Sequence, residues 1–436
     1  MSSLQIGFVG IAALFALLAV RVPIGVSLGA VSIVGIHVLK GGDAAFGAAI
    51  TMPHDFYAKW ELSAIPMFLL MGAVAFHTGM TAGLFRCARL WLSRLPGGLA
   101  VATNFAAALF SAVSGSSVAT AAAMGRIAVP EMLRYKYQPG LATAVAAASG
   151  TIGSLIPPGI LFVLYGMFTG QPIGKLLMAG ILPGLLTVFI YSAMIIVRCK
   201  LDPSLAPPIV EKVSWGERFA SLRAIWPLPV LIFAVIGVLY AGWATATEAA
   251  ALGAFISFVI AAVQRTLTRR SILDSIMETL KGTAMIFFIG VGAILFTRFL
   301  AFSGVPQYMS SLASVFADNP FLLLVMVSVV YLILGMFLDG LGLLMLTLPV
   351  FLPFFEAARI DLIWMGVIIV KFVEISLITP PVGLNAFVIK NVVGSSISLS
   401  TIFRALNWFM LAELVIMGLL FAFPEISLFI PRQMGG

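Results

Sequence analysis

The sequence contains few charged residues, few histidines and few cysteines. Only 10% of its 436 residues are charged and 61% are apolar, whereas a soluble globular domain is about 25% charged and roughly 45–50% apolar. This composition excludes an ordinary soluble protein. Apolar runs of about 18 or more residues recur along the chain, each long enough to cross the hydrocarbon core as a helix. We therefore expect an all-α polytopic membrane protein.

The scarcity of catalytic and nucleotide-binding residues argues against an enzyme. His37, His54 and His77 are the only histidines, and their spacing fits neither a metal site nor a catalytic triad. No glycine-rich loop ending in GK and Ser or Thr is present, so ATP does not drive this chain directly. Cys87 and Cys199 each adjoin an arginine, and we expect both to face a reducing cytosol without a disulfide. We predict no catalytic residues and no organic cofactor.

The basic residues predict how the chain is oriented. The formal net charge is +8, but Lys and Arg occur in short clusters between apolar runs, as the positive-inside rule describes. We place three basic connections, 83–97, 198–225 and 265–281, in the cytoplasm of a bacterial cell with this chain in its inner membrane. Counting crossings from them puts both termini in the periplasm. The same count puts two other connections, residues 54–62 and 356–361, on that side. The N-terminal run lacks a signal-peptide cleavage site, so we expect it to be retained.

Two apolar runs are too long for one straight crossing. They cover about 98–131 and 320–355, and each has a polar, glycine-containing interruption, SGSS at 114–117 and DGLG at 339–342. Such a run is typical of a re-entrant helical hairpin that turns at mid-depth. Unpaired backbone groups at the turn must face protein or water, because they are costly in hydrocarbon. We expect both turns to be buried at a polar place.

Two further runs contain a double proline. They cover about 141–168 and 362–390, and proline removes a backbone donor, so each run predicts a broken helix. Pro130 precedes Pro157 by 27 residues, and Pro353 precedes Pro380 by 27. The charges around the two hairpins are opposite. We therefore predict two inverted repeats, residues 1–225 and 226–436, each with one hairpin and one proline-broken helix. Such paired interruptions are the best sequence indication of a transporter binding site.

Free helix ends, hydroxyls and carbonyls at the first hairpin and break suit a cation. SGSS and GSLIPP provide neutral oxygen ligands for Na⁺, or the small residues simply let helices approach closely. At the second hairpin, Asp339 is an acid inside an apolar run, hence a cation ligand or proton carrier; it could also be a structurally paired or snorkelling carboxylate. Lys371 and Glu374 have the spacing of an internal ion pair, with a substrate contact as the alternative.

Several stretches carry a resemblance to a known family. They are SGSSVATAAAMGRIAVPEM, SGTIGSLIPPGILFVLYG, GWATATEAAALGA, VEISLITPPVGLNAFVIK and FPEISLFIP. Together they closely resemble the large membrane subunit of tripartite ATP-independent periplasmic (TRAP) transporters, of the ion transporter superfamily, over about residues 5–431. The resemblance implies an elevator-type transporter that takes up a small organic anion, a carboxylate, sulfonate or sugar acid, driven by a Na⁺ gradient.

The resemblance also implies partners and site residues. The partners are a separate small membrane subunit of about four helices and a periplasmic substrate-binding protein. The first Na⁺ would be bound by Ser114, Ser117, Gly153, Ile156 and Pro158, and the second by Asp339, Thr379, Pro381 and Gly383. Ser117 stands where the family often has asparagine, and its hydroxyl keeps an oxygen ligand. Candidates for substrate contact are Ser116, Arg126, Ser154 and Asn385, although Arg126 could equally snorkel to the membrane interface.

Three other functions compete with this prediction. A stand-alone ion-coupled symporter or exchanger of the same superfamily would need neither partner. A membrane-embedded enzyme would need a cluster of His, Asp or Glu at one depth, which the sequence lacks. A purely structural membrane protein would have no use for polar hairpin turns.

Overall fold

The computed structural model describes residues 1–208, 213–317 and 320–434, and within these ranges all regular secondary structure is helical, with no strand. Six of the described helices are long and apolar enough to cross a membrane, and a seventh span results if α12 (Trp215–Ala224) and α13 (Pro227–Tyr240), bent by 52°, are counted as one. The prediction of an all-α polytopic membrane protein is confirmed.

The first half of the chain contains α1 to α11. The bounds are α1 (Ser3–Ala19), α2 (Ile24–Lys40), α3 (Gly42–Tyr57), α4 (Ala64–His77), α5 (Leu84–Leu92), α6 (Gly98–Ser114), α7 (Ser117–Arg134), α8 (Pro139–Gly150), α9 (Ile160–Thr169), α10 (Ile173–Ala179) and α11 (Ile181–Leu201). A short 3₁₀ turn at Trp60–Ser63 joins α3 to α4.

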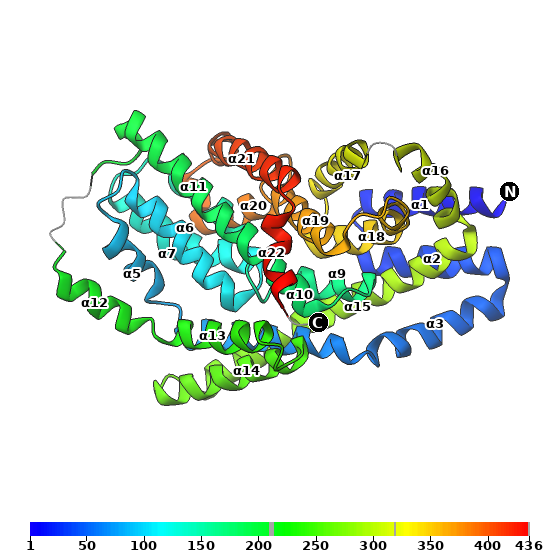
Figure 1. The fold of residues 1–436 in the computed structure, drawn as a ribbon, viewed down its shortest axis with the longest axis horizontal. Helices are drawn as coiled ribbons and strands as arrows, with labels where there is room; N and C mark the ends of the chain where they lie inside the picture. The colour runs from blue at the N-terminus through cyan, green and yellow to red at the C-terminus, as the bar shows by residue number, and fades with distance from the viewer. Residues whose placement is uncertain (209–212, 318–319, 435–436) are drawn as a thin grey trace.

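The second half continues from α12 and α13. It contains α14 (Ala246–Val263), α15 (Arg269–Ser303), α16 (Val305–Ala317), α17 (Pro320–Gly335), α18 (Gly340–Ala357), α19 (Leu362–Ser376), α20 (Leu384–Val393), α21 (Leu399–Ala422) and α22 (Glu425–Gln433). In Figure 1, α5 to α7 and α11 lie at one end of the molecule, α1, α2 and α16 to α18 lie at the other, and α19 and α22 lie between them.

The SGSS segment joins two helices that pack against each other as a hairpin, α6 and α7. Gly115 ends α6 because its φ of +60° places it in the left-handed region, which glycine adopts without strain. Ser116 then begins α7, and its Oγ accepts a hydrogen bond from the Ala119 N–H at 3.4 Å. Local turn and capping chemistry therefore fixes the hairpin tip.

The DGLG segment joins α17 and α18, which also pack together. Asp339 is the N-cap of α18, where one carboxylate oxygen accepts the N–H groups of Leu341 and Gly342, both at 3.2 Å. An ionised carboxylate is favourable at this position because it satisfies free donors at the positive end of the helix dipole. The acid inside the apolar run thus has a structural use.

Each double proline separates two helices. Residues 151–159 divide α8 from α9, and residues 377–383 divide α19 from α20. The Pro157–Pro158 and Pro380–Pro381 peptide bonds are both cis. The two interruptions occupy corresponding places after the two hairpins, as the shared spacing of the prolines predicts.

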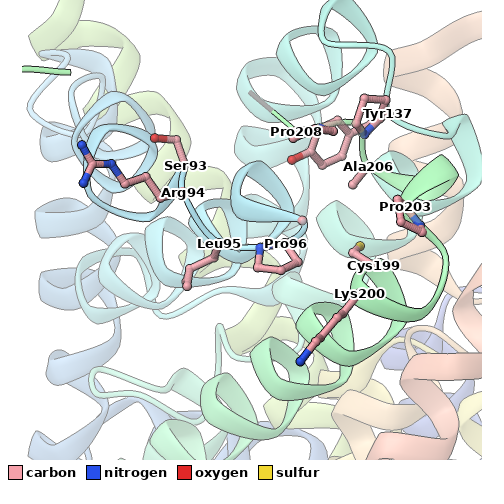
Figure 2. A pocket seen from close by; sticks show the side chains of 12 residues that line it. Ser93, Arg94, Leu95, Pro96, Tyr137, Cys199, Lys200, Pro203, Ala206 and Pro208 are labelled. Carbon is pink, nitrogen blue, oxygen red and sulfur yellow. The ribbon is translucent and has the colours of Figure 1, made fainter. Parts of the chain in front are cut away.

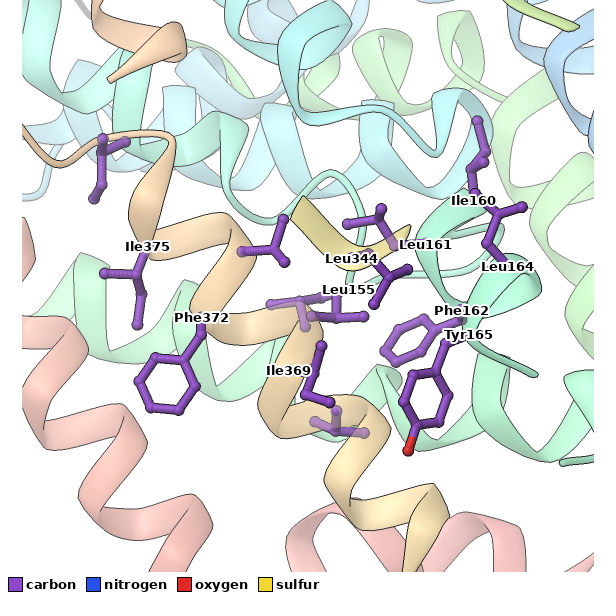
Figure 3. Close-up of a cluster of buried hydrophobic side chains, with 14 of the residues drawn as sticks. Leu155, Ile160, Leu161, Phe162, Leu164, Tyr165, Leu344, Ile369, Phe372 and Ile375 are labelled. Carbon is purple, nitrogen blue, oxygen red and sulfur yellow. The ribbon is translucent and has the colours of Figure 1, made fainter. Parts of the chain in front are cut away.

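The two halves are interleaved at their broken helices. α20, after the second break, packs on α7 and α8, whereas α9, after the first break, packs on α18 and α19. Figure 3 shows the buried apolar contact that results, in which Leu155, Phe162 and Tyr165 lie near Leu344 and Ile369. Van der Waals packing of these side chains holds the two breaks in a fixed relation, as it does between helices in a membrane.

The helices extend further into the predicted connections than the sequence indicated. Residues 265–281 were expected to form a basic connection, but α15 begins at Arg269 and runs for 35 residues. A capping box of Thr268 and Ser271 starts it, and its charges lie on its exposed surface, where Arg270 pairs with Asp274. Residues 54–62, likewise expected as a connection, begin inside α3, which buries Phe56.

Candidate functional site

The first hairpin tip touches the first helix break through backbone atoms. A Cβ added at Gly115 would lie 2.1 Å from the Pro158 carbonyl oxygen, and one added at Gly153 would lie 2.6 Å from the Ser117 Cα. Neither position has room for a side chain. The two glycines therefore permit a close approach that brings carbonyls of the break to the SGSS segment, which is the juxtaposition expected from the sequence.

Hydroxyl groups line this junction. The Ser117 and Ser154 Oγ atoms are 3.0 Å apart, and both residues are buried. Ser114 Oγ lies 3.2 Å from Thr120 Oγ1. The structure thus gathers five predicted residues, Ser114, Ser117, Gly153, Ser154 and Pro158. The Ile156 side chain points elsewhere, into a small apolar cluster formed with Ala108, Ala112, Ile152 and Val188.

The second half of the chain completes the junction. Glu374 of α19 and Asn385 of α20 are both fully buried. Ser117 donates its hydroxyl hydrogen to Glu374 Oε1 at 2.6 Å, and Asn385 donates its side-chain N–H to the Ala147 carbonyl at 3.3 Å. Glu374 Oε2 and Asn385 Oδ1 are buried with no hydrogen-bond partner among the described residues.

These groups fit a hard monovalent cation. Oxygen atoms of hydroxyls, carbonyls and carboxylates are the ligands that such ions prefer, and unwound segments in transporters provide them. Buried oxygens without donors are costly unless something compensates them. The groups that could hold Na⁺ at this junction are the Ser114 and Ser117 hydroxyls, together with carbonyls of the break such as that of Pro158.

The predicted ion pair between Lys371 and Glu374 is wrong. Lys371 Nζ instead lies 2.7 Å from Glu413 Oε1 of α21 and donates to Thr187 Oγ1 of α11 at 3.0 Å. The Tyr191 hydroxyl also donates to Glu413 Oε1. The sequence analysis missed Glu413, although an acid inside a terminal apolar run is the same signal that marked Asp339. The sequence alone gives no sign that α21 packs close enough to α19 for Lys371 and Glu413 to pair.

The second set of predicted residues is gathered less tightly. A Cβ at Gly383, whose φ is +55°, would lie 3.1 Å from the Thr379 carbonyl oxygen, so these two residues adjoin. The Thr379 hydroxyl donates to the Ile375 carbonyl, and Pro381 is exposed. The tip bearing Asp339 packs against the end of α19, where Cβ atoms on Gly335 and Gly340 would meet Ser376 and Val373.

Two substrate candidates lie outside the buried junction. Arg126 is exposed on α7, nine residues beyond Ser117, which is about 13 Å along a helix. Ser116 is half-buried at the tip, where it caps α7. Ser154 and Asn385, by contrast, belong to the junction.

Two cavities lie away from the junction. One of about 320 Å³ near the start of α6 has Arg94 and Lys200 at its rim and Tyr137 in its wall (Figure 2). Burial raises the pKa of Tyr137 to about 12, and its oxygen accepts the Leu99 N–H at 3.2 Å. Another, of about 330 Å³, lies between α3, α9 and α15 beside Lys59 and Arg298. Neither includes a predicted ligand.

Paired hairpins and proline-broken helices that meet at buried polar groups define an architecture of secondary transporters. The chain belongs to the family described as "Tripartite ATP-independent periplasmic transporter, DctM component", whose sequence profile matches residues 11–426. The resemblance noted in the sequence is thereby confirmed, and the chain is a multi-pass permease component of a transporter.

Named relatives agree with this assignment, and a solved structure shares the fold. The chain is 37% identical over 378 residues to the C4-dicarboxylate TRAP transporter large permease protein DctM of Pseudomonas aeruginosa, covering 86% of this chain and 87% of that protein. It is 30% identical over 375 residues to the sialic acid TRAP transporter large permease protein SiaM of Vibrio cholerae, with the same coverage. The crystal structure of the Alcanivorax borkumensis YdaH transporter has the same fold, with a TM-score of 0.64, 14% identity, and coverage of 89% of this chain and 91% of that one.

Proposed function

We propose that this chain is the large permease subunit of a transporter that takes up a small organic anion, a carboxylate, sulfonate or sugar acid, across the bacterial inner membrane and couples uptake to a Na⁺ gradient. The contact of the first hairpin tip with the first break carries the proposal. Gly115 and Gly153 let the backbones meet, and hydroxyls of both segments gather there. Helical hairpins and broken helices with free oxygens suit a coupling cation.

The substrate class follows from the relatives. The two compared above are named for a C4-dicarboxylate and for sialic acid, and both substrates are carboxylates. Helix N-termini at the hairpin tips favour negative charge. Ser116, Ser154 and Asn385 are therefore proposed to contact the anion, and Arg126 is proposed to meet it during transfer.

Two cation sites are proposed. The first comprises Ser114, Ser117, Gly153, Ile156 and Pro158, and its observed close packing supports it. The second comprises Asp339, Thr379, Pro381 and Gly383 at the second hairpin and break. Asp339 caps α18. In the second cation site, its carboxylate would therefore bind the ion while it also accepts the N–H groups at the start of the helix.

The proposal includes two partners and a direction of insertion. A small membrane subunit of about four helices and a periplasmic substrate-binding protein would complete the transporter, as the word tripartite in the family description suggests. Both termini would lie in the periplasm, on the basis of the basic connections. The hairpins and broken helices would move together as an elevator against the rest of the chain.

Uptake in proteoliposomes tests this function. The chain would be reconstituted with the small subunit and the binding protein of its own transporter, and uptake of labelled anion measured with and without an inward Na⁺ gradient. We expect uptake only with both the gradient and the binding protein. Uptake that is the same with and without the Na⁺ gradient would contradict the proposed Na⁺ coupling. Uptake without the binding protein would favour the stand-alone symporter or exchanger.

A further inference from the structure

The buried charges in the middle of the molecule do not balance. Lys371, Glu374 and Glu413 have side chains that are 0%, 0% and 1% exposed, respectively. One of these groups is a base and two are acids. A buried charge is very costly unless an opposite charge or several hydrogen bonds compensate it. With all three groups ionised, the cluster would be one positive charge short.

The hydrogen bonds assign the missing charge to Glu374. Lys371 Nζ lies 2.7 Å from Glu413 Oε1, and the Tyr191 hydroxyl donates to the same oxygen. Glu413 thus has a direct cationic partner. Glu374 has no direct ion pair within the described part of the chain, although the Lys371 charge lies near enough to act on it. Its carboxylate accepts the Ser117 hydroxyl at Oε1 and is also within reach of the Ser154 hydroxyl, whereas Oε2 has no geometric hydrogen bond there. The carboxylate without a direct cationic partner is the one that faces the first hairpin tip.

The contact with Ser117 has a consequence for cation binding. A hydroxyl oxygen that binds a cation uses its lone pairs, so its hydrogen must be donated elsewhere. Ser117 donates to Glu374 Oε1 at 2.6 Å, and its oxygen lies 3.0 Å from the Ser154 hydroxyl. Glu374 therefore orients the Ser117 hydroxyl so that its lone pairs point away from the carboxylate, on the side where the Ser154 hydroxyl lies.

We propose that Glu374 supplies the negative charge of the first cation site and orients the Ser117 hydroxyl toward the bound Na⁺. The inference rests on the proposed Na⁺ coupling and adds to it a residue from the opposite half of the chain. A monovalent cation at this site brings the cluster to neutrality. Because α19 and α7 both contribute, binding of the ion ties the second broken helix to the first hairpin.

Thermal unfolding of the purified full-length chain tests the proposal directly. Apparent melting temperature would be followed against Na⁺ concentration, with choline chloride keeping the ionic strength constant. A ligand that binds only the folded state raises the melting temperature, so Na⁺ should stabilise the native chain. Glu374→Gln should require at least about tenfold more Na⁺ for the same shift. Glu356→Gln, at an exposed acid on α18, is the matched control and should respond as the native chain does.

The melting temperature without Na⁺ separates this role from a structural one. Removing an uncompensated buried charge relieves its desolvation penalty, so Glu374→Gln in choline should melt at or above the native temperature. A carboxylate that only braces the fold would instead lower the melting temperature when neutralised. That result, or a native Na⁺ response in Glu374→Gln, would overturn the proposal.

A double-mutant cycle gives a second test that does not use Glu374→Gln. Ser117→Ala and Glu374→Asp would each weaken the Na⁺ response, and their combination should weaken it by less than the product of the single effects, since the residues act together. If the two effects simply multiply, Ser117 and Glu374 act independently, and the proposed role of Glu374 in orienting Ser117 is contradicted. If the native chain itself shows no Na⁺ response, the proposed Na⁺ coupling fails; if it responds and the variants match it, only the role of Glu374 fails.

Discussion

At the scale of single residues, the junction depends on glycines that allow close approach and on a buried ion pair that joins distant helices. Gly115 has both a positive φ and a carbonyl oxygen where its side chain would be. Lys371 and Glu413 hold α19 against α21 with neither group exposed to solvent. Each feature can be removed by one substitution for which the chain offers a matched control.

Gly115→Ala should destabilise the protein more than Gly170→Ala. Both glycines have similar φ angles, +60° and +67°, but nothing lies near a Cβ at Gly170. The left-handed backbone alone costs about 1–2 kcal/mol in either variant, and the clash with Pro158 adds about 1–3 kcal/mol at Gly115. Melting temperatures of the two purified variants measure the difference. Equal losses would mean that the tip does not depend on this contact.

Lys371→Met should be strongly destabilising because it leaves Glu413 buried without its cation. Breaking a buried ion pair in this way costs about 3–5 kcal/mol. The control is Arg270→Met, which breaks an exposed pair with Asp274 and should cost less than about 1 kcal/mol. Thermal or denaturant unfolding would compare the two. A small loss in Lys371→Met would show that Glu413 finds another partner.

At the scale of helices, the interruptions were predictable and several helices were not. Glycine, serine and double proline act on the chain locally, so the tips at 114–117 and 339–342 lie where the sequence places them. α3 was missed because its sequence mixes polar and apolar residues. The first turns of α15 were missed because their charged residues are typical of a loop. The side of the membrane that each hairpin faces remains a prediction.

Single-cysteine labelling would test the opposite orientation of the hairpins. Arg134 and Glu356 lie near the ends of α7 and α18, the returning arms of the two hairpins, and both are exposed. In intact cells, a membrane-impermeant maleimide should label Glu356→Cys and spare Arg134→Cys until the cells are lysed. Cys87 and Cys199 are buried, so their background labelling should be low. Labelling of both variants in intact cells would contradict the inverted repeat.

At the scale of the whole molecule, the sequence indicated which segments matter but not how the halves meet. The first hairpin and break could be paired from their composition, since both are polar interruptions in one half. The contribution of Glu374 and Asn385 could not, because it depends on α19 and α20 packing across the boundary between the halves. The Lys371–Glu413 pair lies within the second half and was missed because its members are 42 residues apart in the chain, so that the pair depends on how α21 packs on α19.

Simultaneous measurement of sodium and substrate flux tests the central claim most directly. Proteoliposomes containing the complete transporter would be loaded without Na⁺, and uptake of radioactive sodium followed together with uptake of labelled anion. The account predicts that anion uptake is accompanied by sodium uptake and that Ser117→Ala reduces both. Anion uptake with no accompanying sodium, or a Ser117→Ala variant with unchanged sodium uptake, would contradict it.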